Sequence, residues 1–204
     1  MAETPPTLID LLRHGEPEGG TRFRGYTDDP LSEQGWAQMR AAVQPDEQWD
    51  AVVASPLLRC VEFAAELAGR LGVPLETETR FQEIGFGEWE GRTYDELHLS
   101  HPGRLDLFLR DPARHTPPGG EKLDDFIERV TAAWLELLAR HDGKRILLVA
   151  HGGVNRVILC HALQIPTQNL FRLEVKFAGR SRIRVLSGGD EPFPQLVFHG
   201  SPQP

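Results

Sequence analysis

Three short, almost uninterrupted apolar runs constrain the fold of this 204-residue chain more than any other feature of its sequence. They occupy residues 7–12, 51–54 and 145–150. Runs of this length without polar alternation are typical of strands that are buried on both faces of a parallel sheet. Each is followed by a polar turn and then by a segment with helical periodicity. The pattern predicts an α/β fold, a three-layer α/β/α sandwich around a mostly parallel sheet.

The helical segments carry start and stop signals that set their expected limits. Ser32 is expected to cap one helix, and the Ser55-Pro56 pair is expected to cap a second helix that ends at Gly72. Apolar residues with i, i+3, i+4, i+7 spacing predict a long helix between residues 123 and 143. These apolar faces are expected to form the core.

The middle and the tail of the chain differ from this regular pattern. Residues 81–120 are interrupted by glycine and proline, and we expect them to form an insert over the active site within a single domain of residues 1–204. The tail turns at Ala178-Gly179 and continues to Leu186. The sequence therefore predicts an antiparallel edge strand, preceded by a strand with strict apolar alternation at Phe171, Leu173, Val175 and Phe177.

Composition excludes several classes of function. The chain has 22 Lys and Arg residues against 30 Asp and Glu, a net charge of −8, which argues against a broad nucleic-acid surface. Two cysteines are too few for a disulfide framework. No apolar run approaches the roughly 18 residues of a membrane span, and no signal peptide is recognisable. We therefore expect a cytoplasmic protein without nucleic-acid or membrane partners, and the sequence leaves open whether it forms a homodimer.

Polar groups follow each of the three predicted strands. They are Arg13-His14-Gly15, Ser55 with Arg59 one helical turn later, and His151-Gly152-Gly153. Ligands of open α/β sheets bind at the carboxyl ends of the strands, where these groups would converge. Two arginines, two histidines and the amides of helix N-termini favour a tetrahedral oxyanion such as phosphate. A neutral imidazole could act there as a nucleophile.

Other interpretations of these residues compete with this one. A single histidine at a strand end is usually a hydrogen-bonded structural residue. A metal site built from His14, His151 and a carboxylate stays open, although neighbouring arginines would repel the cation; we expect neither a metal ion nor a cofactor. The chain contains no P-loop, no G-x-S-x-G elbow, no H-E-x-x-H and no paired C-x-x-C motif.

Five segments together resemble the motifs of a known family. In chain order they resemble the R-H-G, G-x-x-D-x-x-L-[ST]-x-x-G, S-P-L-x-R, E-x-x-F-G-x-W-E-G and V-x-H-G-G motifs of the histidine phosphatase superfamily, which includes the cofactor-dependent phosphoglycerate mutases. The resemblance covers residues 8–185. The segments are Arg13-His14-Gly15, residues 24–35, residues 55–59, residues 83–91 and residues 149–153.

The resemblance implies a role for each matched residue. His14 would be the nucleophile that becomes a phosphohistidine, and Glu83 would be the general acid and then the general base. The phosphoryl oxygens would be bound by Arg13, Arg59 and His151, with Gly152 beside them. Cationic donors around a loose transition state can supply most of this catalysis. The residue pattern alone does not distinguish Glu83 from Glu88, Glu90 and Glu121, which are otherwise expected to be solvated surface carboxylates.

The resemblance also suggests a branch. Residues 89–91 and 117–121 look more like the phosphatases, particularly α-ribazole phosphatase, than like the mutases. The implied function is metal-independent hydrolysis of a small phosphorylated metabolite through a phosphohistidine, with α-ribazole 5′-phosphate of cobalamin biosynthesis as one candidate. A mutase-type phosphotransferase and a non-catalytic module that binds a phosphorylated ligand are the alternatives. Lys122 stands where the family pattern places serine. Candidate contacts for the rest of the substrate are Arg22, Arg24, Arg110 and His115.

Overall fold

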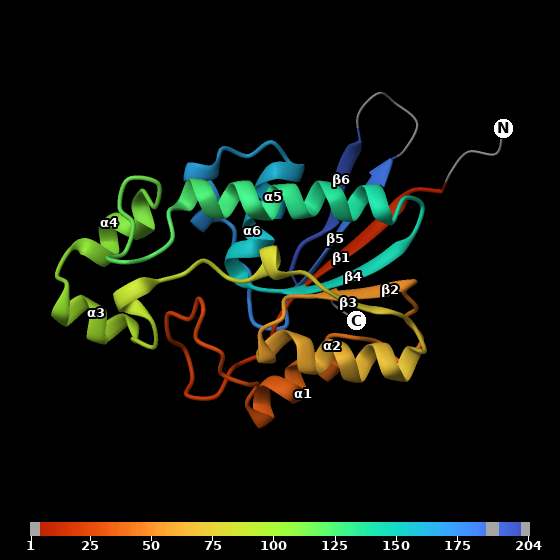
Figure 1. Cartoon of the computed structure of the whole chain (residues 1–204), viewed down its shortest axis with the longest axis horizontal. Helices are drawn as coiled ribbons and strands as arrows, with labels where there is room; N and C mark the ends of the chain where they lie inside the picture. The colour runs from red at the N-terminus through yellow and green to blue at the C-terminus, as the bar shows by residue number, and fades with distance from the viewer. Residues whose placement is uncertain (1–4, 187–191, 201–204) are drawn as a thin grey trace.

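A computed structural model describes residues 5–186 and 192–200. Within these residues one six-stranded sheet has the order β3-β2-β4-β1-β5-β6 (Figure 1). The four strands from β3 to β1 are parallel, and β5 and β6 continue the sheet in antiparallel orientation. This confirms the predicted mostly parallel sheet with an antiparallel edge. The strands are β1 (Thr7–Arg13), β2 (Ala51–Ala54), β3 (Leu75–Thr77), β4 (Arg145–Ala150), β5 (Arg180–Leu186) and β6 (Phe193–Phe198).

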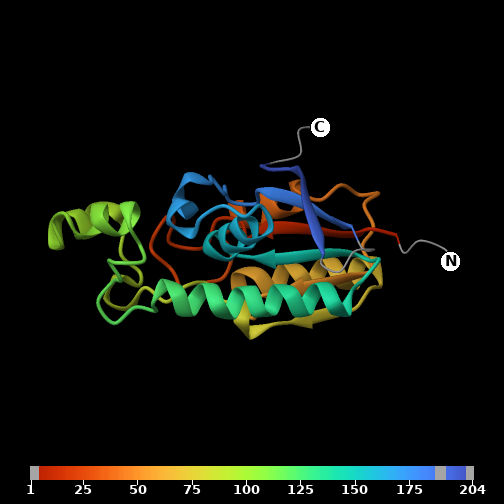
Figure 2. The ribbon, with the colours of Figure 1, turned by 90° about the horizontal axis from the view of Figure 1, so that it is seen from above.

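Helices cover both faces of the sheet, as the three-layer prediction requires (Figures 1 and 2). Side chains of a strand alternate between its faces, so neighbouring residues of β1 enter different cores. Leu11 packs with residues of α5 and α6, whereas Leu12 packs with residues of α1 and α2. The four helices are α1 (Glu33–Ala41), α2 (Leu58–Leu71), α5 (Leu123–Arg140) and α6 (Gly152–Ala162).

The predicted insert contains two short helices, α3 (Tyr94–Ser100) and α4 (Arg104–Arg110). They project beyond one end of the sheet (Figures 1 and 2). A capping box at Thr93 begins α3. The insert has its own small core of Trp89, Leu97, Leu105 and Phe108. Two single-turn 3-10 helices precede α3, at Thr79–Phe81 where the insert begins and at Gly87–Trp89 within it.

Two local predictions are wrong. The helix α2 begins at Leu58, with Leu57 as a cap that makes no side-chain bond, so Ser55 lies before the cap. The Ser55 hydroxyl lies 2.7 Å from Nε2 of His151 and 3.5 Å from the backbone nitrogen of Leu57. The alternating tail is not a strand: residues 167–172 form a 3-10 helix and the following residues form a loop. The antiparallel edge consists instead of β5 and β6. The sequence analysis also missed β3, which has only three residues.

No helix in the described part of the chain is long and apolar enough to cross a membrane.

Candidate active site

The carboxyl ends of β1 and β4 bring the two predicted site histidines together. Arg13 pairs with Ala150 in the sheet register, so His14 and His151 are the next residues on adjacent strands. Their rings lie edge to face with centroids 5.2 Å apart. Beside them is a cavity of about 180 Å³. Its lining includes Arg13, His14, Glu83, Gly152 and the side chains of Arg22, Phe23, Arg24, Phe86, Arg156, Phe171 and Phe177.

His14 is held in one orientation and one tautomer. Its Nδ1 lies 2.7 Å from the carbonyl oxygen of Gly15, which can only accept a hydrogen bond, so Nδ1 carries the proton. The lone pair is therefore on Nε2. Burial lowers the pKa of His14 well below 6.5, and the positive charges of Arg13 and Arg59 lower it further. The imidazole is consequently neutral, the form that a nucleophile requires.

One fully buried and one partly buried arginine lie near the histidines. Arg59 is fully buried, and its two terminal nitrogens donate to the carbonyl oxygens of Thr27 and Gly25 at 2.6 and 2.9 Å. Arg13 donates through Nη1 to the carbonyl of Val175 at 2.7 Å. Burial lowers its pKa to about 10, so it keeps its charge at neutral pH. The Nε atoms of both arginines are buried without an acceptor among the described residues. Buried donors of this kind suit the oxygens of an anion.

His151 is oriented by Ser55, one of the polar groups that were expected to converge at the strand ends. Its Nε2 lies 2.7 Å from the hydroxyl of Ser55, and both side chains are fully buried. Burial lowers the pKa of His151 well below 6.5, and the charge of Arg59 contributes in the same direction. Ser55 therefore positions His151 and does not cap α2.

The carboxylate of Glu83 is hydrogen-bonded to the N-terminus of α6. Its Oε2 accepts a hydrogen bond from the backbone N–H of Gly153 at 3.0 Å, and its Oε1 accepts one from Ile84 at 3.1 Å. A methyl group at Gly153 would lie 2.3 Å from Oε1, so glycine is required for this approach. The second glycine of the late V-x-H-G-G motif therefore makes room for the carboxylate.

Two other glutamates hold the site in place, contrary to the expectation that they are solvated surface carboxylates. Glu121 binds Arg129, which donates to the backbone carbonyls of residues 80, 82 and 83 and so fixes the chain at Glu83. Glu90 accepts hydrogen bonds from the backbone N–H groups of residues 25–27 and 86. The carbonyls of this same loop hold Arg59.

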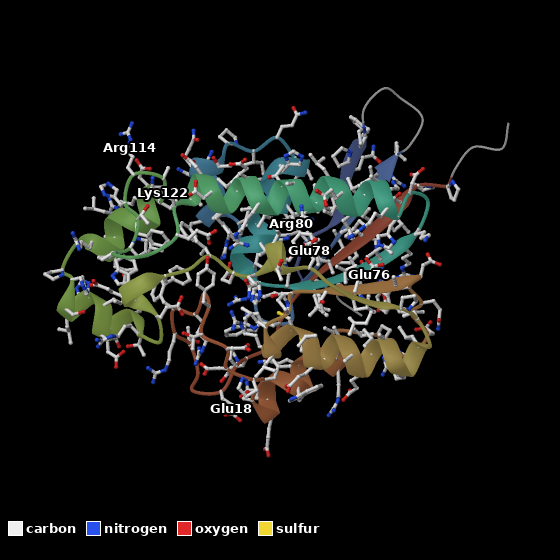
Figure 3. All side chains as sticks on the ribbon, in the orientation of Figure 1. Glu18, Glu76, Glu78, Arg80, Arg114 and Lys122 are labelled. Carbon is white, nitrogen blue, oxygen red and sulfur yellow. The ribbon has the colours of Figure 1, made fainter. Side chains whose placement is uncertain are left out.

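The residues predicted to contact the rest of the substrate lie in different places in the structure. Arg22 and Arg24 line the cavity, but both donate to carbonyls of nearby loops, and Arg24 also binds Asp29. His115 lines a different cavity of about 220 Å³ in the insert. Its neighbour Arg114 is exposed and lies at the outer edge of the molecule (Figure 3).

Four further predicted positions lie outside the cavity lining. Arg59 and His151 are fully buried and do not reach it. Arg110 ends α4 in the insert, and Lys122 is the N-cap of α5 (Figure 3). Arg156 lines the cavity although it was not among the predicted site residues. Its position one turn into α6 follows the same rule that selected Arg59 in α2, because helical side chains lean toward the helix N-terminus. No group of three or more His, Cys, Asp or Glu side chains among the described residues could hold a metal ion.

Curated relatives include several phosphatases. Over 170 residues the chain is 34% identical to glucosyl-3-phosphoglycerate phosphatase of Mycolicibacterium vanbaalenii, which covers 78% of this chain and 75% of the relative. It is 33% identical over 185 residues to bifunctional protein Rv2228c of Mycobacterium tuberculosis, covering 88% of this chain. The chain spans about half the length of that relative and of two further mycobacterial relatives.

Solved structures share the fold over nearly the whole chain. The native structure of mycobacterial glucosyl-3-phosphoglycerate phosphatase Rv2419c superposes with a TM-score of 0.86 at 27% identity, covering 97% of this chain and all of the other. The α-ribazole phosphatase of Shigella flexneri has a TM-score of 0.81 at 23% identity, covering 95% and 96% of the two chains, and so shares the fold. The family model of the histidine phosphatase superfamily (branch 1) matches residues 9–192, and the chain therefore belongs to this superfamily.

Proposed function

We propose that the protein is a phosphatase that hydrolyses small phosphomonoesters through a phosphohistidine at His14 and needs no metal ion. The observation that carries this proposal is the fixed tautomer of His14, which leaves the Nε2 lone pair free near Arg13 and Arg59, whose Nε atoms are buried without an acceptor among the described residues. Family membership and the names of several relatives support the same reaction class.

The proposed reaction has two steps. In the first, the Nε2 lone pair of His14 forms a bond to phosphorus as the ester P–O bond breaks, and the carboxyl group of Glu83 protonates the leaving oxygen. In the second, the Glu83 carboxylate takes a proton from water, whose oxygen attacks phosphorus. The P–N bond then breaks, its electron pair returns to Nε2, and phosphate leaves.

The residues around the reacting group have distinct parts in this reaction. Arg13, Arg59 and His151, together with the N–H groups at the start of α6, would stabilise the charge that spreads over the three equatorial oxygens. The pKa values of both histidines lie well below 6.5, so both imidazoles are neutral at neutral pH. The Nε2 lone pair of His14 is therefore available to form the bond to phosphorus. The action of Glu83 on the leaving oxygen is supported by the Gly153 amide, which holds the carboxylate at the cavity wall.

Hydrolysis of p-nitrophenyl phosphate in the presence of EDTA tests the proposal. We expect turnover by the wild type, a loss of at least about 1000-fold in His14→Ala, and no loss in His161→Ala, whose side chain is exposed on α6. Rapid quenching should trap a phosphoenzyme that is labile in acid and stable in alkali. Equal rates for wild type and His14→Ala would refute the nucleophile, and stoichiometric binding without turnover would indicate a binding module.

The substrate is a separate question. α-Ribazole 5′-phosphate is one candidate, motivated by residues 89–91 and 117–121, and glucosyl-3-phosphoglycerate is another, motivated by a relative's name. A panel containing both, assayed for phosphate release, would rank them by kcat/KM. Isomer formation from phosphoglycerates without phosphate release would instead indicate a mutase.

A further inference from the structure

Residues 171–177, whose apolar alternation suggested a strand, hold two arginines in the same manner. Each guanidinium donates to one backbone carbonyl of this segment and lies near one of its phenylalanine rings. For Arg13, the carbonyl is that of Val175 at 2.7 Å, and the ring of Phe177 lies 4.0 Å from the guanidinium carbon. The backbone carbonyls and the phenylalanine rings of this segment therefore orient arginine side chains at the cavity wall.

Arg156 is the second arginine that this segment holds. Its Nε donates to the carbonyl of Leu173 at 2.8 Å, and its guanidinium carbon lies 5.7 Å from the centre of the Phe171 ring. Neither terminal nitrogen of Arg156 makes a hydrogen bond to any residue that the structure describes, and no carboxylate in residues 5–186 and 192–200 forms an ion pair with it. The side chain is half-buried and lines the cavity.

The position of Arg156 relative to the reacting groups follows from Gly152. A methyl group at Gly152 would lie 3.0 Å from Nη1 of Arg156 and 3.4 Å from Nε of Arg13, so the two guanidinium groups flank the same point at the start of α6. Glu83 accepts from the amide of the next residue, Gly153, at 3.0 Å, and its charge is the one that raises the pKa of both arginines most. Arg156, Arg13 and Glu83 therefore meet at the start of α6 in the wall of the same cavity.

The positive charge at the cavity exceeds what one phosphoryl group needs. The Nε atoms of Arg13 and Arg59 have no acceptor among the described residues and remain for the transferring oxygens, whereas all three nitrogens of Arg24 donate to its own loop and Asp29. Arg156 keeps both terminal nitrogens for a planar, bidentate acceptor. Such an acceptor is a carboxylate or a second phosphate.

We propose that Arg156 and Phe171 form a subsite for a carboxylate on the leaving alcohol, so that the enzyme favours small phosphomonoesters of hydroxy acids. This inference rests on the proposed phosphatase function. The four phenylalanine rings of the cavity lining would contact the short carbon skeleton between the two anionic groups. They belong to Phe23, Phe86, Phe171 and Phe177.

Two probes that differ only in this group test the proposal. In 3-phosphoglycerate a carboxylate stands where glycerol 3-phosphate has a hydroxymethyl group. We expect the wild type to favour the carboxylate probe by about 10-fold or more in kcat/KM, as for a hydrogen bond to a charged group. Arg156→Gln should lose most of this preference, mainly through KM, and Arg156→Lys should keep part of it, because lysine retains the charge without the fork.

Arg172→Gln is the matched control, because Arg172 is exposed on the same segment and lines a different cavity. It should keep the wild-type ratio between the probes, and circular dichroism should show that all variants are folded. A wild type without preference for the carboxylate, or a preference that persists in both Arg156 variants, would overturn the subsite. Failure of the proposed function is distinguishable, since His14→Ala would then hydrolyse both probes as fast as the wild type.

Discussion

Gly153→Ala should separate the two proposed tasks of Glu83 because it changes the position of the carboxylate and leaves its chemistry intact. The added methyl carbon would lie 2.3 Å from Oε1 of Glu83 and 3.1 Å from Cδ, whereas ordinary contact begins near 3.4 Å. The carboxylate must therefore move by about 1 Å, a displacement that can cost about 100-fold in rate. The ring of Phe126, whose Cζ would be 3.2 Å from the new carbon, blocks an alternative movement of the backbone.

The expected kinetics depend on the leaving group. p-Nitrophenolate leaves without protonation, so Gly153→Ala should still release a burst of p-nitrophenol and then turn over slowly, because the second step needs Glu83 as a base. An alkyl phosphate needs the general acid, so its burst should be lost and its kcat should fall about 100-fold. Rapid-quench measurement of both alcohols provides the comparison.

The matched control is Gly69→Ala in α2, where an added methyl group meets nothing within 4 Å. This variant should keep wild-type kinetics and gain about 0.5–1 kcal/mol of stability, because alanine is favoured over glycine inside a helix. A folded Gly153→Ala enzyme that hydrolyses alkyl phosphates within twofold of the wild-type rate would refute both the packing argument and the role of Glu83.

Three further changes have defined outcomes. The pKa values of buried His14 and His151 lie well below 6.5, so below pH 6.5 the unfolded chain binds more protons than the folded chain. As the pH falls, the free energy of unfolding should therefore decrease by about 1.4 kcal/mol per pH unit for each histidine. A free energy from urea unfolding that is constant between pH 6.5 and 5 would contradict this. Glu90→Ala removes the acceptor for the loop that holds Arg59, so kcat for p-nitrophenyl phosphate should fall about 10-fold and stability by about 1–3 kcal/mol; a Glu90→Ala enzyme with wild-type kcat would show that the loop is held without it. Asp10→Ala should destabilise by about 3 kcal/mol in urea, because the fully buried carboxylate pairs with Arg182 and accepts from an indole N–H, and a loss below 1 kcal/mol would show that this pair is not needed.

Much of the architecture is predictable because it depends on local patterns. Uninterrupted apolar runs such as residues 145–150 can be buried only inside a sheet with helices on both faces, and the Ser32 cap is confirmed by its bond to the Gly35 amide. The expected meeting of His14 and His151 also follows from strand order, because β1 and β4 are neighbours with parallel register. These inferences require only periodicity and the direction of the strands.

The roles of several polar residues depend on contacts that no local pattern contains. Ser55 was expected to cap a helix because serine before proline favours that position, but the helix begins three residues later, and the hydroxyl bonds a buried histidine 96 residues away. Apolar residues do alternate in residues 171–177, but backbone carbonyls of this segment accept hydrogen bonds from arginine side chains, and the segment does not pair with the sheet. In both cases a buried charged or polar partner competes successfully for the hydrogen bond.

The layered α/β fold, and the residues at the strand ends that could bind an oxyanion, follow from local patterns in the chain; the choice of Glu83 depended on resemblance to a family. The tertiary structure decided which nitrogen of His14 is free, why Gly153 must lack a side chain, and that Glu90, Glu121 and Arg156 belong to the site. The physical reason is that burial and hydrogen bonding between distant segments set the pKa, the tautomer and the orientation of a polar side chain. Hydrophobic periodicity alone is sufficient to place a strand or a helix.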